Sequence, residues 1–347
     1  MIRLQSTPLN TVKDAQTRLQ LAIGVEFGTL PPYLYALYSI RPGTNAAARK
    51  NLLAIALQEM IHMCLDCNVL NAIGGNPVIQ VQPYPGPLPG DIGPDHTPLS
   101  LHLLPFSPDA MQQGMNIEEP EDKPDFPVRE TLALAAVPTA VTIGQFYREL
   151  DDFLKTLPST AWTPNRNQIS DDQFFAGQIF PIDSYDDAHK AITEIISEGE
   201  GTQSGTTHDP LDFQSEVAHF FRFGEIFHDR ILTKSNDPQG YAFGPDKFGV
   251  DWNGACPAIT DPGTHDFSHE PPSAQAAQKA CNQAFTNLID TLQRGVSGTA
   301  GALGEAVQAM FALRMAALHA FTVPLADPTK VAGPAFLYQP HPTGGAV

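Results

Sequence analysis

The sequence predicts an all-α protein: a four-helix bundle of two helical hairpins, joined by a long Pro-rich crossover and followed by a C-terminal helical extension. Apolar residues recur at helical spacing in several long segments. A stretch dense in Pro and Gly, near residues 77–130, separates the first two segments from the rest. With 42% apolar residues among 347, the chain can bury a large core. We expect the bundle over residues 14–240 and the extension, packed on it, over 241–347.

The first hairpin is predicted from residues 14–40 and 45–73. In the first segment the apolar spacing surrounds Glu26, and Pro31 and Pro32 should kink the helix or split it in two. The turn Arg-Pro-Gly-Thr follows. The second segment is rich in Ala and Leu and ends at a Gly-Gly-Asn-Pro sequence, which is typical of a helix C-terminus. Two helices joined by so short a turn should lie antiparallel.

The rest of the chain is predicted to alternate loops and helices. The Pro-rich segment is too long for an ordinary connector, so it is either a functional cover or a crossover between helix pairs. Short β-pieces are expected within it at residues 78–81 and 99–104. Further helices are predicted over residues 142–156, 184–199, 210–231, 273–294 and 302–320. Those over 184–199 and 210–231 are the third and fourth long helices of the bundle.

Composition excludes several classes of function. The chain has 20 Lys and Arg against 38 Asp and Glu, a formal charge of −18, and no basic cluster. Nucleic acids and anionic membranes are therefore not expected partners. Four cysteines in so long a chain do not indicate a disulfide framework. There is neither an apolar N-terminal leader nor an uncharged apolar run of 18 residues, so a cytoplasmic protein is the expectation.

Two Glu-x-x-His pairs carry the chemistry. They are Glu59 with His62 in the second helix and Glu216 with His219 in the fourth predicted helix. Residues three apart share a helix face, so the carboxylate and the imidazole can bind one metal ion. Bundles with a dinuclear carboxylate site use two such pairs and add one Glu from each remaining helix.

The single Glu of the first helix is Glu26, whose neighbours are apolar or small, which is costly for an unpaired carboxylate. It mirrors Glu59 about the turn, so both should lie at one height. The third predicted helix offers Glu194, Glu198 and Glu200. The hairpin mirror of Glu216 falls close to Glu194, but spacing alone does not decide among the three.

Three further residues could support the site. Asp66 lies one helical turn after His62 and could accept a hydrogen bond from an imidazole N–H, or it could be a solvated acid. Tyr33 could hydrogen bond beside the metals, although a core aromatic residue is the simpler interpretation. Arg222 could neutralise a site carboxylate or an anionic substrate, with a surface salt bridge as the alternative.

Several motifs together resemble the ferritin-like domain of iminophenylpyruvate dimer synthases, the enzymes of violacein- and rebeccamycin-type bisindole biosynthesis. They are GTLPPYLYALYSI, QEMIHMCLDCNVLNAIGGNPV, YPGPLP, IEEPE, TIGQFYREL, SEGEGT, AHFFRFGEI, AVQAMFALRMAAL and GPAFLYQP. The resemblance spans roughly residues 15–337 and implies a stand-alone ferritin-like four-helix bundle. The metal ligands that it implies are Glu26, Glu59, His62, Glu200, Glu216 and His219, with Glu194 as the alternative to Glu200.

The functional expectation is a di-metal carboxylate protein holding two iron ions, with manganese or zinc as alternatives. Such a site would use dioxygen or peroxide to oxidise or oxidatively couple a small organic substrate, amino-acid-derived if the resemblance extends to chemistry. The alternatives are a ferroxidase or iron-handling protein, and a non-catalytic ferritin-like scaffold or binding module. A small molecule is the expected partner, and the oligomeric state stays open, a homo-oligomer included.

Overall fold

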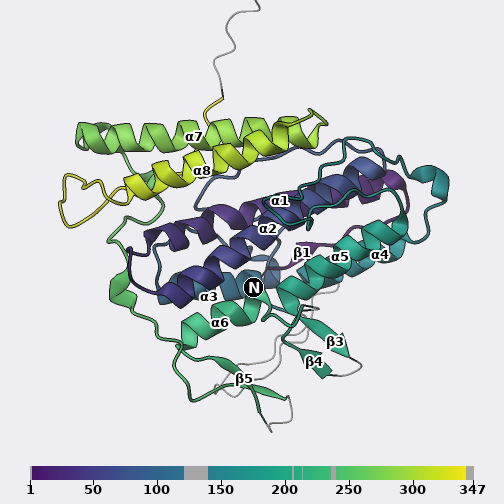
Figure 1. Ribbon diagram of the computed structural model, residues 1–347, viewed down its shortest axis with the longest axis horizontal. Helices are drawn as coiled ribbons and strands as arrows, with labels where there is room; N and C mark the ends of the chain where they lie inside the picture. Colours follow the sequence, from purple (N-terminus) through teal and green to yellow (C-terminus); the bar gives the residue numbers. More distant parts are fainter. Residues whose placement is uncertain (1, 121–139, 205–206, 213, 236–239, 341–347) are drawn as a thin grey trace, which may run out of the picture.

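The first hairpin is the long antiparallel pair α1 (Val12–Ser39) and α2 (Ala46–Ala72), which runs through the middle of the molecule (Figure 1). The computed structural model describes residues 2–120, 140–204, 207–212, 214–235 and 240–340. At the start of α1, the Thr11 side chain accepts from the backbone N–H of Asp14, whose carboxylate in turn accepts from the backbone N–H of Thr11. The predicted bounds of this hairpin are confirmed.

The second half of the bundle is built from four short helices. These are α3 (Pro108–Ile117), α4 (Ile143–Leu154), α5 (Tyr185–Glu200) and α6 (His219–His228). Helix α3 packs along α6, and α4 packs along α5. Helices α5 and α6 therefore follow one another along the bundle, as do α3 and α4 (Figure 1). The sequence had predicted α5 and α6 as the two arms of one hairpin, and α3 was not predicted.

Helix α6 begins at His219, nine residues later than predicted, and Asp212 supplies the reason. Its carboxylate accepts from the backbone N–H groups of Gln214 and Glu216, a local arrangement that competes with helix formation. Between them Ser215 has a positive φ of 63°, and Val217 forms a β-bridge with Leu211. The segment before His219 is thus an irregular loop, despite its helical apolar spacing.

The Pro-rich crossover completes the hydrogen bonding of α1. Pro31 and Pro32 lie inside one uninterrupted helix, where the sequence had predicted a kink or a split. Pro32 has no N–H, so the carbonyl of Gly28, one turn earlier, loses its usual helical donor. The hydroxyl of Tyr84, in the crossover, donates to that carbonyl at 2.6 Å. A neighbouring crossover side chain, Gln82, donates to the carbonyl of Gly24 at 2.9 Å.

The C-terminal extension is a second antiparallel hairpin, α7 (Pro272–Val296) and α8 (Ala302–Ala320), laid across the outer face of α1 and α2 (Figure 1). Its apolar side chains, among them Phe285, Ile289 and Leu313, join the main core. The predicted all-α bundle with a C-terminal helical extension is confirmed. The domain boundary at residue 240 stays a prediction.

Strands are few and short. The antiparallel pairs are β1 (Leu4–Gln5) with β2 (Ala140–Val141), β3 (Thr202–Ser204) with β4 (Thr207–Asp209), and β5 (Leu232–Lys234) with β6 (Tyr241–Phe243). Single 3₁₀ turns occupy Pro94–His96, Ser159–Ala161, Trp252–Gly254, Pro262–Thr264 and Phe267–His269. Neither β-piece predicted in the crossover is a strand, although Leu101 forms an isolated bridge with Gly86.

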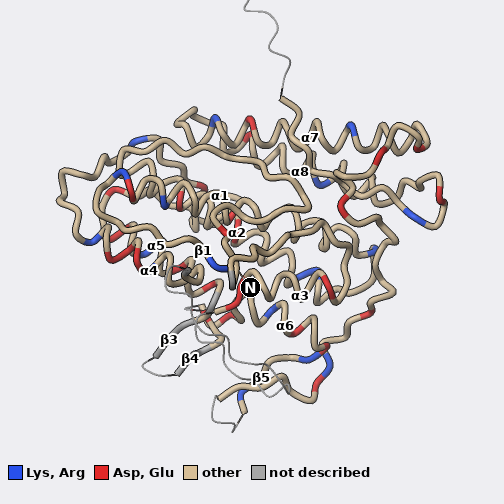
Figure 2. The backbone as a smooth tube through the Cα atoms, turned by 180° about the vertical axis from the view of Figure 1, so that it is seen from behind, with Lys and Arg blue, Asp and Glu red and all other residues tan. Residues whose placement is uncertain are grey.

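Among the described helices, α2 alone is long and apolar enough to cross a bilayer by length and composition. In its most apolar stretch, 72% of the residues are buried inside the protein, as the central helix of a bundle requires. Seen from behind, the acidic positions are spread over the chain and the fewer basic ones are scattered among them (Figure 2).

The role of Tyr84 can be measured by removing its hydroxyl. We expect Tyr84→Phe to lower the free energy of unfolding by about 1–2 kcal/mol, because the buried Gly28 carbonyl loses its donor. Urea denaturation measures the change. Tyr38→Phe is the matched control, since Tyr38 is buried on α1 and its hydroxyl has no hydrogen bond among the described contacts. Equal losses in the two variants would contradict this role.

Candidate metal centre

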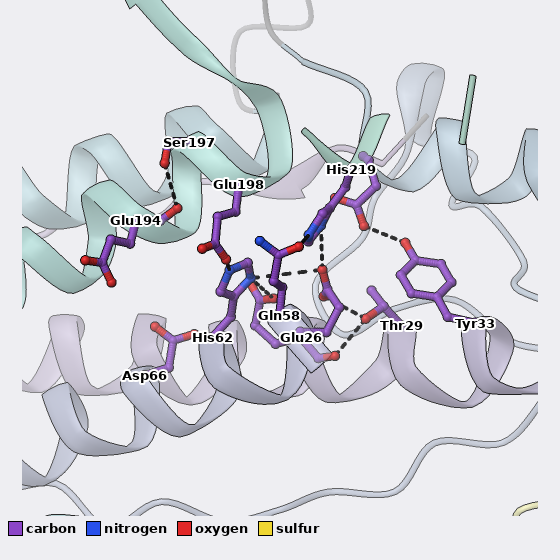
Figure 3. A network of polar contacts seen from close by, with 12 residues as sticks. Glu26, Thr29, Tyr33, Gln58, His62, Asp66, Glu194, Ser197, Glu198 and His219 are labelled. Carbon is purple, nitrogen blue, oxygen red and sulfur yellow. Dashed lines mark hydrogen bonds and ion pairs between the residues drawn. The ribbon is translucent and has the colours of Figure 1, made fainter. Parts of the chain in front are cut away.

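Glu26 of α1 and Glu59 and His62 of α2 form the first cluster of possible metal ligands. Figure 3 shows Glu26 and His62 on the side of these helices that faces Glu198. All three are buried. The Nδ1 atom of His62 lies 3.5 Å from a carboxylate oxygen of Glu26 and 4.0 Å from one of Glu59. The predicted meeting of Glu26 and Glu59 at one height is confirmed.

Glu59, Glu118 and His219 form the second cluster. The Nδ1 atom of His219 lies 2.9 Å from Oε1 of Glu59 and 3.7 Å from Oε2 of Glu118. Glu59 therefore belongs to both clusters and lies between them. The two imidazole rings stack with their centroids 5.7 Å apart.

Each carboxylate is held by a hydroxyl. The Thr29 hydroxyl lies 2.9 Å from Glu59 and 2.8 Å from the backbone carbonyl of Glu26, and its one proton serves one of them at a time. Tyr33 donates to Glu118 at 2.5 Å, and Tyr147 donates to Glu26 at 2.6 Å. The hydroxyl of Tyr147 is also 2.7 Å from Asp66, which is fully buried. Since one phenol carries one proton, these two carboxylates and the phenol share it unless Asp66 is itself protonated. Burial, together with the charge of Glu26, raises the pKa of Asp66 well above its ordinary value.

The outer ring nitrogens also have defined partners. Nε2 of His62 lies 2.7 Å from Glu198, and Nε2 of His219 lies 3.2 Å from Oε1 of Gln58. A carboxylate can only accept, and the Gln58 oxygen is identified by a second donor, Arg222, at 3.1 Å. Both histidines therefore carry hydrogen on Nε2, and each presents Nδ1 to the glutamates.

The breaks in the second helix pair place these groups. Glu118 directly follows α3, His219 is the first residue of α6, Glu198 lies in the last turn of α5, and Tyr147 lies in the second turn of α4. All four short helices thus begin or end beside the same point of α1 and α2. An uninterrupted helix could not supply both Glu118 and Tyr147 at this height, because the chain between them is far longer than one turn.

The electrostatics of the cluster show how costly it is without a cation. Burial and the charges of Glu118 and Glu26 raise the pKa of Glu59 to about 8. Burial works against protonation of His219, but Glu118 and Glu59 outweigh it and raise its pKa to about 9. In the same way Glu198 and Glu26 raise the pKa of His62 well above its ordinary value. Protons held by these three residues therefore offset the carboxylate charge.

The residues present fit a pair of metal ions. Nδ1 of His219 is buried and has no hydrogen bond in the described part of the chain, although Glu59 lies 2.9 Å away. A buried nitrogen that faces two carboxylates, without hydrogen-bond geometry to either, is placed to share a cation with them in place of its proton. Each cluster offers two carboxylates and one imidazole, a donor set that suits iron, manganese or zinc.

Comparison with known proteins agrees with this architecture. A family model described as ferritin-like matches residues 19–228, which contain every residue of both clusters. The chain belongs to the ferritin-like family. A solved structure of a ferritin-like protein from Caulobacter vibrioides is similar to it, with a TM-score of 0.67, 22% identity, and coverage of 96% of this chain and 100% of that one. At that identity the likeness shows the fold alone. A search of curated proteins found no match.

In this ferritin-like protein, the structure brings together four of the predicted ligands, Glu26, Glu59, His62 and His219. Glu216 needs correction. Its side chain is 62% exposed and pairs with Arg222 at 2.7 Å, because the loop before α6 turns it away from the face that carries His219. Glu118, from α3, stands where a fourth-helix glutamate was expected. Arg222 thus forms the salt bridge considered as its alternative role, although its own side chain is buried and only its partner Glu216 is exposed.

Of the three glutamates considered on the third predicted helix, the structure describes the side chains of Glu194 and Glu198, and Glu200 stays a prediction. Glu194 is half-buried, lies 3.9 Å from Lys190 and points away from the imidazoles (Figure 3). Glu200 is the last residue of α5, and its side chain lies outside the described residues. Glu198, the third of these candidates, reaches the site as the partner of His62.

Of the residues predicted to support the site, Tyr33 has one of its proposed roles and Asp66 has a different partner. Tyr33 hydrogen bonds to Glu118 beside the site, the role that was weighed against the simpler interpretation of a core aromatic residue. Asp66 was expected to accept from an imidazole, but its carboxyl group is paired with the Tyr147 hydroxyl at 2.7 Å, and Glu198 is the carboxylate that faces the imidazole of His62. The residues that sequence reasoning missed are Glu118, Tyr147, Thr29 and Gln58. Glu118 lies in the IEEPE motif and Tyr147 in the TIGQFYREL motif. Both motifs were recognised in the sequence, but neither residue was assigned to the site.

The raised pKa values predict a pH dependence for the metal-free protein. A group whose pKa is raised on folding stabilises the fold below its unfolded pKa, and this contribution is lost as pH rises through the folded pKa. His62, His219 and Glu59 all follow this rule. We therefore expect the melting temperature in chelator to fall between about pH 6.5 and pH 9.

Scanning calorimetry across that range measures the change. With a saturating divalent metal the fall should be smaller, because the cation replaces the protons that are lost. A melting temperature in chelator that is constant or rises with pH would contradict the assignment of buried protons to this cluster.

Proposed function

We propose that this chain is a di-iron carboxylate oxidoreductase that uses dioxygen or peroxide to oxidise or couple a small organic substrate. The observation that carries the proposal is the sharing of Glu59 between two clusters of identical composition. A pair of metal ions needs a carboxylate placed between two equivalent sets of donors. A single metal ion does not need one. The motif resemblance to iminophenylpyruvate dimer synthases supports an amino-acid-derived substrate of secondary metabolism.

The donor chemistry supports iron. Each position combines hard carboxylate oxygens with one imidazole, without a thiolate, and this favours iron or manganese over softer metals. Glu26, Glu59 and Glu118 contribute three negative charges against four positive charges of two divalent ions. The remaining charge is offset by Glu198, next to His62. A bound pair of iron ions would supply the electrons that reduce dioxygen or peroxide.

A small cavity beside the two clusters limits which molecules can reach them. A cavity of about 30 Å³ reaches both clusters, and its apolar lining includes Val25, Ile117 and Ile195. This volume holds about two water molecules or one diatomic molecule. Its lining is partly exposed at Ile196 and Gly199. We infer that the small oxidant enters the cavity, whereas an organic substrate reacts at its mouth, beside the end of α5.

Two tyrosines hold protons at the ligands. Tyr33 donates to Glu118 and Tyr147 donates to Glu26, so each outer carboxylate has one phenolic proton within hydrogen-bond distance. Burial raises the pKa of both phenols well above the ordinary value. Both phenols therefore stay protonated through the neutral pH range. Their hydrogen bonds stabilise the negative charge of the Glu118 and Glu26 carboxylates.

Metal analysis of two matched variants tests the site. Protein purified without added metal or chelator should contain about two iron ions per chain by plasma mass spectrometry. Glu118→Gln should lower this to about one, because it removes a donor from one position alone. Glu194→Gln should keep two, since that carboxylate points away from the clusters. Unchanged metal content in Glu118→Gln, or a loss in Glu194→Gln, would contradict the assignment.

Repeated oxidation separates the proposed enzyme from iron storage. After several additions of iron(II) and dioxygen, the iron content should stay at two per chain if the metals are resident. Growth far beyond two would favour a ferroxidase. Wild-type protein that contains no metal, or one zinc ion, would leave a ferritin-like scaffold as the better description.

A further inference from the structure

The two clusters are matched in every group that faces the metals. Each has a shared Glu59, one outer glutamate and one histidine that presents Nδ1. Each outer glutamate accepts from a buried tyrosine, Tyr147 on one side and Tyr33 on the other. Ligand type and ligand charge therefore predict equal affinity at the two positions.

The clusters differ one layer farther from the metals: Asp66 contacts Tyr147 on the Glu26 side, and the two histidines have different partners. Nε2 of His62 donates to the carboxylate of Glu198, whereas Nε2 of His219 donates to the amide oxygen of Gln58. A carboxylate partner makes an imidazole more electron-donating than an amide partner does, and such outer partners change metal affinity by about 10- to 100-fold. The 2.7 Å and 3.2 Å distances agree with a stronger bond at His62.

Gln58 is itself fixed by its neighbours. Its oxygen also accepts from Arg222, a buried cation that withdraws electron density from it, and its amide hydrogen bonds to Glu198. His219 and Arg222 thus donate to Gln58, and Gln58 and His62 donate to Glu198, so these hydrogen bonds converge on Glu198. Arg222 is in turn held by Glu216.

We infer that Gln58 and Glu198 are positioning residues that make the two metal positions unequal. The position at Glu26 and His62 binds the first metal ion and holds it more tightly, and the position at Glu118 and His219 fills second. This inference rests on the proposed two-metal function and adds its order of loading. The residue pair that sets the order touches neither metal directly.

The test exchanges the two partners while conserving charge. In the double variant Gln58→Glu/Glu198→Gln, His62 would face an amide and His219 a carboxylate, and the two exchanged side chains could still hydrogen bond to each other. Titration with cobalt(II), monitored by calorimetry and by visible absorption, measures the affinities of both positions. Glu118→Gln isolates the His62 position, and Glu26→Gln isolates the His219 position.

We expect the wild type to bind two cobalt ions with affinities that differ by about 10- to 100-fold. In the isolating backgrounds, the exchange should weaken the His62 position and tighten the His219 position, so that the order reverses. A general structural defect would weaken both, and circular dichroism with thermal melting checks that the variants fold. Two equal wild-type affinities, or an exchange that leaves the order unchanged, would overturn the inference and leave the proposed function standing. Binding of no cobalt would overturn both.

Discussion

The structure depends on the burial of several carboxylates at one point inside a helical bundle. Glu26, Glu59, Glu198 and Asp66 are nearly inaccessible to water, and Glu118 is largely covered. Carboxylates crowded together in an apolar core repel one another and lose hydration, so each needs a donor, a proton or a cation. The hydroxyls of Thr29, Tyr33 and Tyr147 and the two imidazoles supply part of this, and a pair of metal ions would supply the rest. The arrangement of the helices around this point follows from that requirement.

The broken second helix pair is the clearest consequence. Because α3 and α5 end at the site and α4 and α6 begin there, side chains reach it from four helix termini as well as from two helix faces. The faces of the long helices α1 and α2 supply Glu26, Glu59 and His62. The crossover completes the hydrogen bonding of α1 by giving the Gly28 carbonyl a donor that Pro32 cannot provide. The C-terminal hairpin covers the opposite apolar face, so the central pair is enclosed on both sides.

Much of this was predictable from sequence, and the exceptions have identifiable causes. Long apolar periodicity located α1, α2, α7 and α8 within a few residues, and the short turn of the first hairpin brought Glu26 and Glu59 to one height. The second Glu-x-x-His misled because a sequence spacing does not guarantee a continuous helix. The Asp212 side chain holds the preceding loop in place, so Glu216 turns away while His219 turns inward. Glu118 was not assigned, because its place in the site depends on tertiary contacts of a short helix inside a Pro-rich stretch.

The comparison of the two clusters shows why the residues that contact the metals do not describe the site completely. Their direct donors are alike, and the asymmetry enters through Glu198 and Gln58, one layer farther out. The central claim, however, concerns the shared carboxylate. It is tested most directly by anomalous diffraction at the iron edge from crystals of the iron-loaded protein. We expect two peaks, one beside Glu26 and His62 and one beside Glu118 and His219, with Glu59 between them. A single peak, or peaks away from these five side chains, would contradict it.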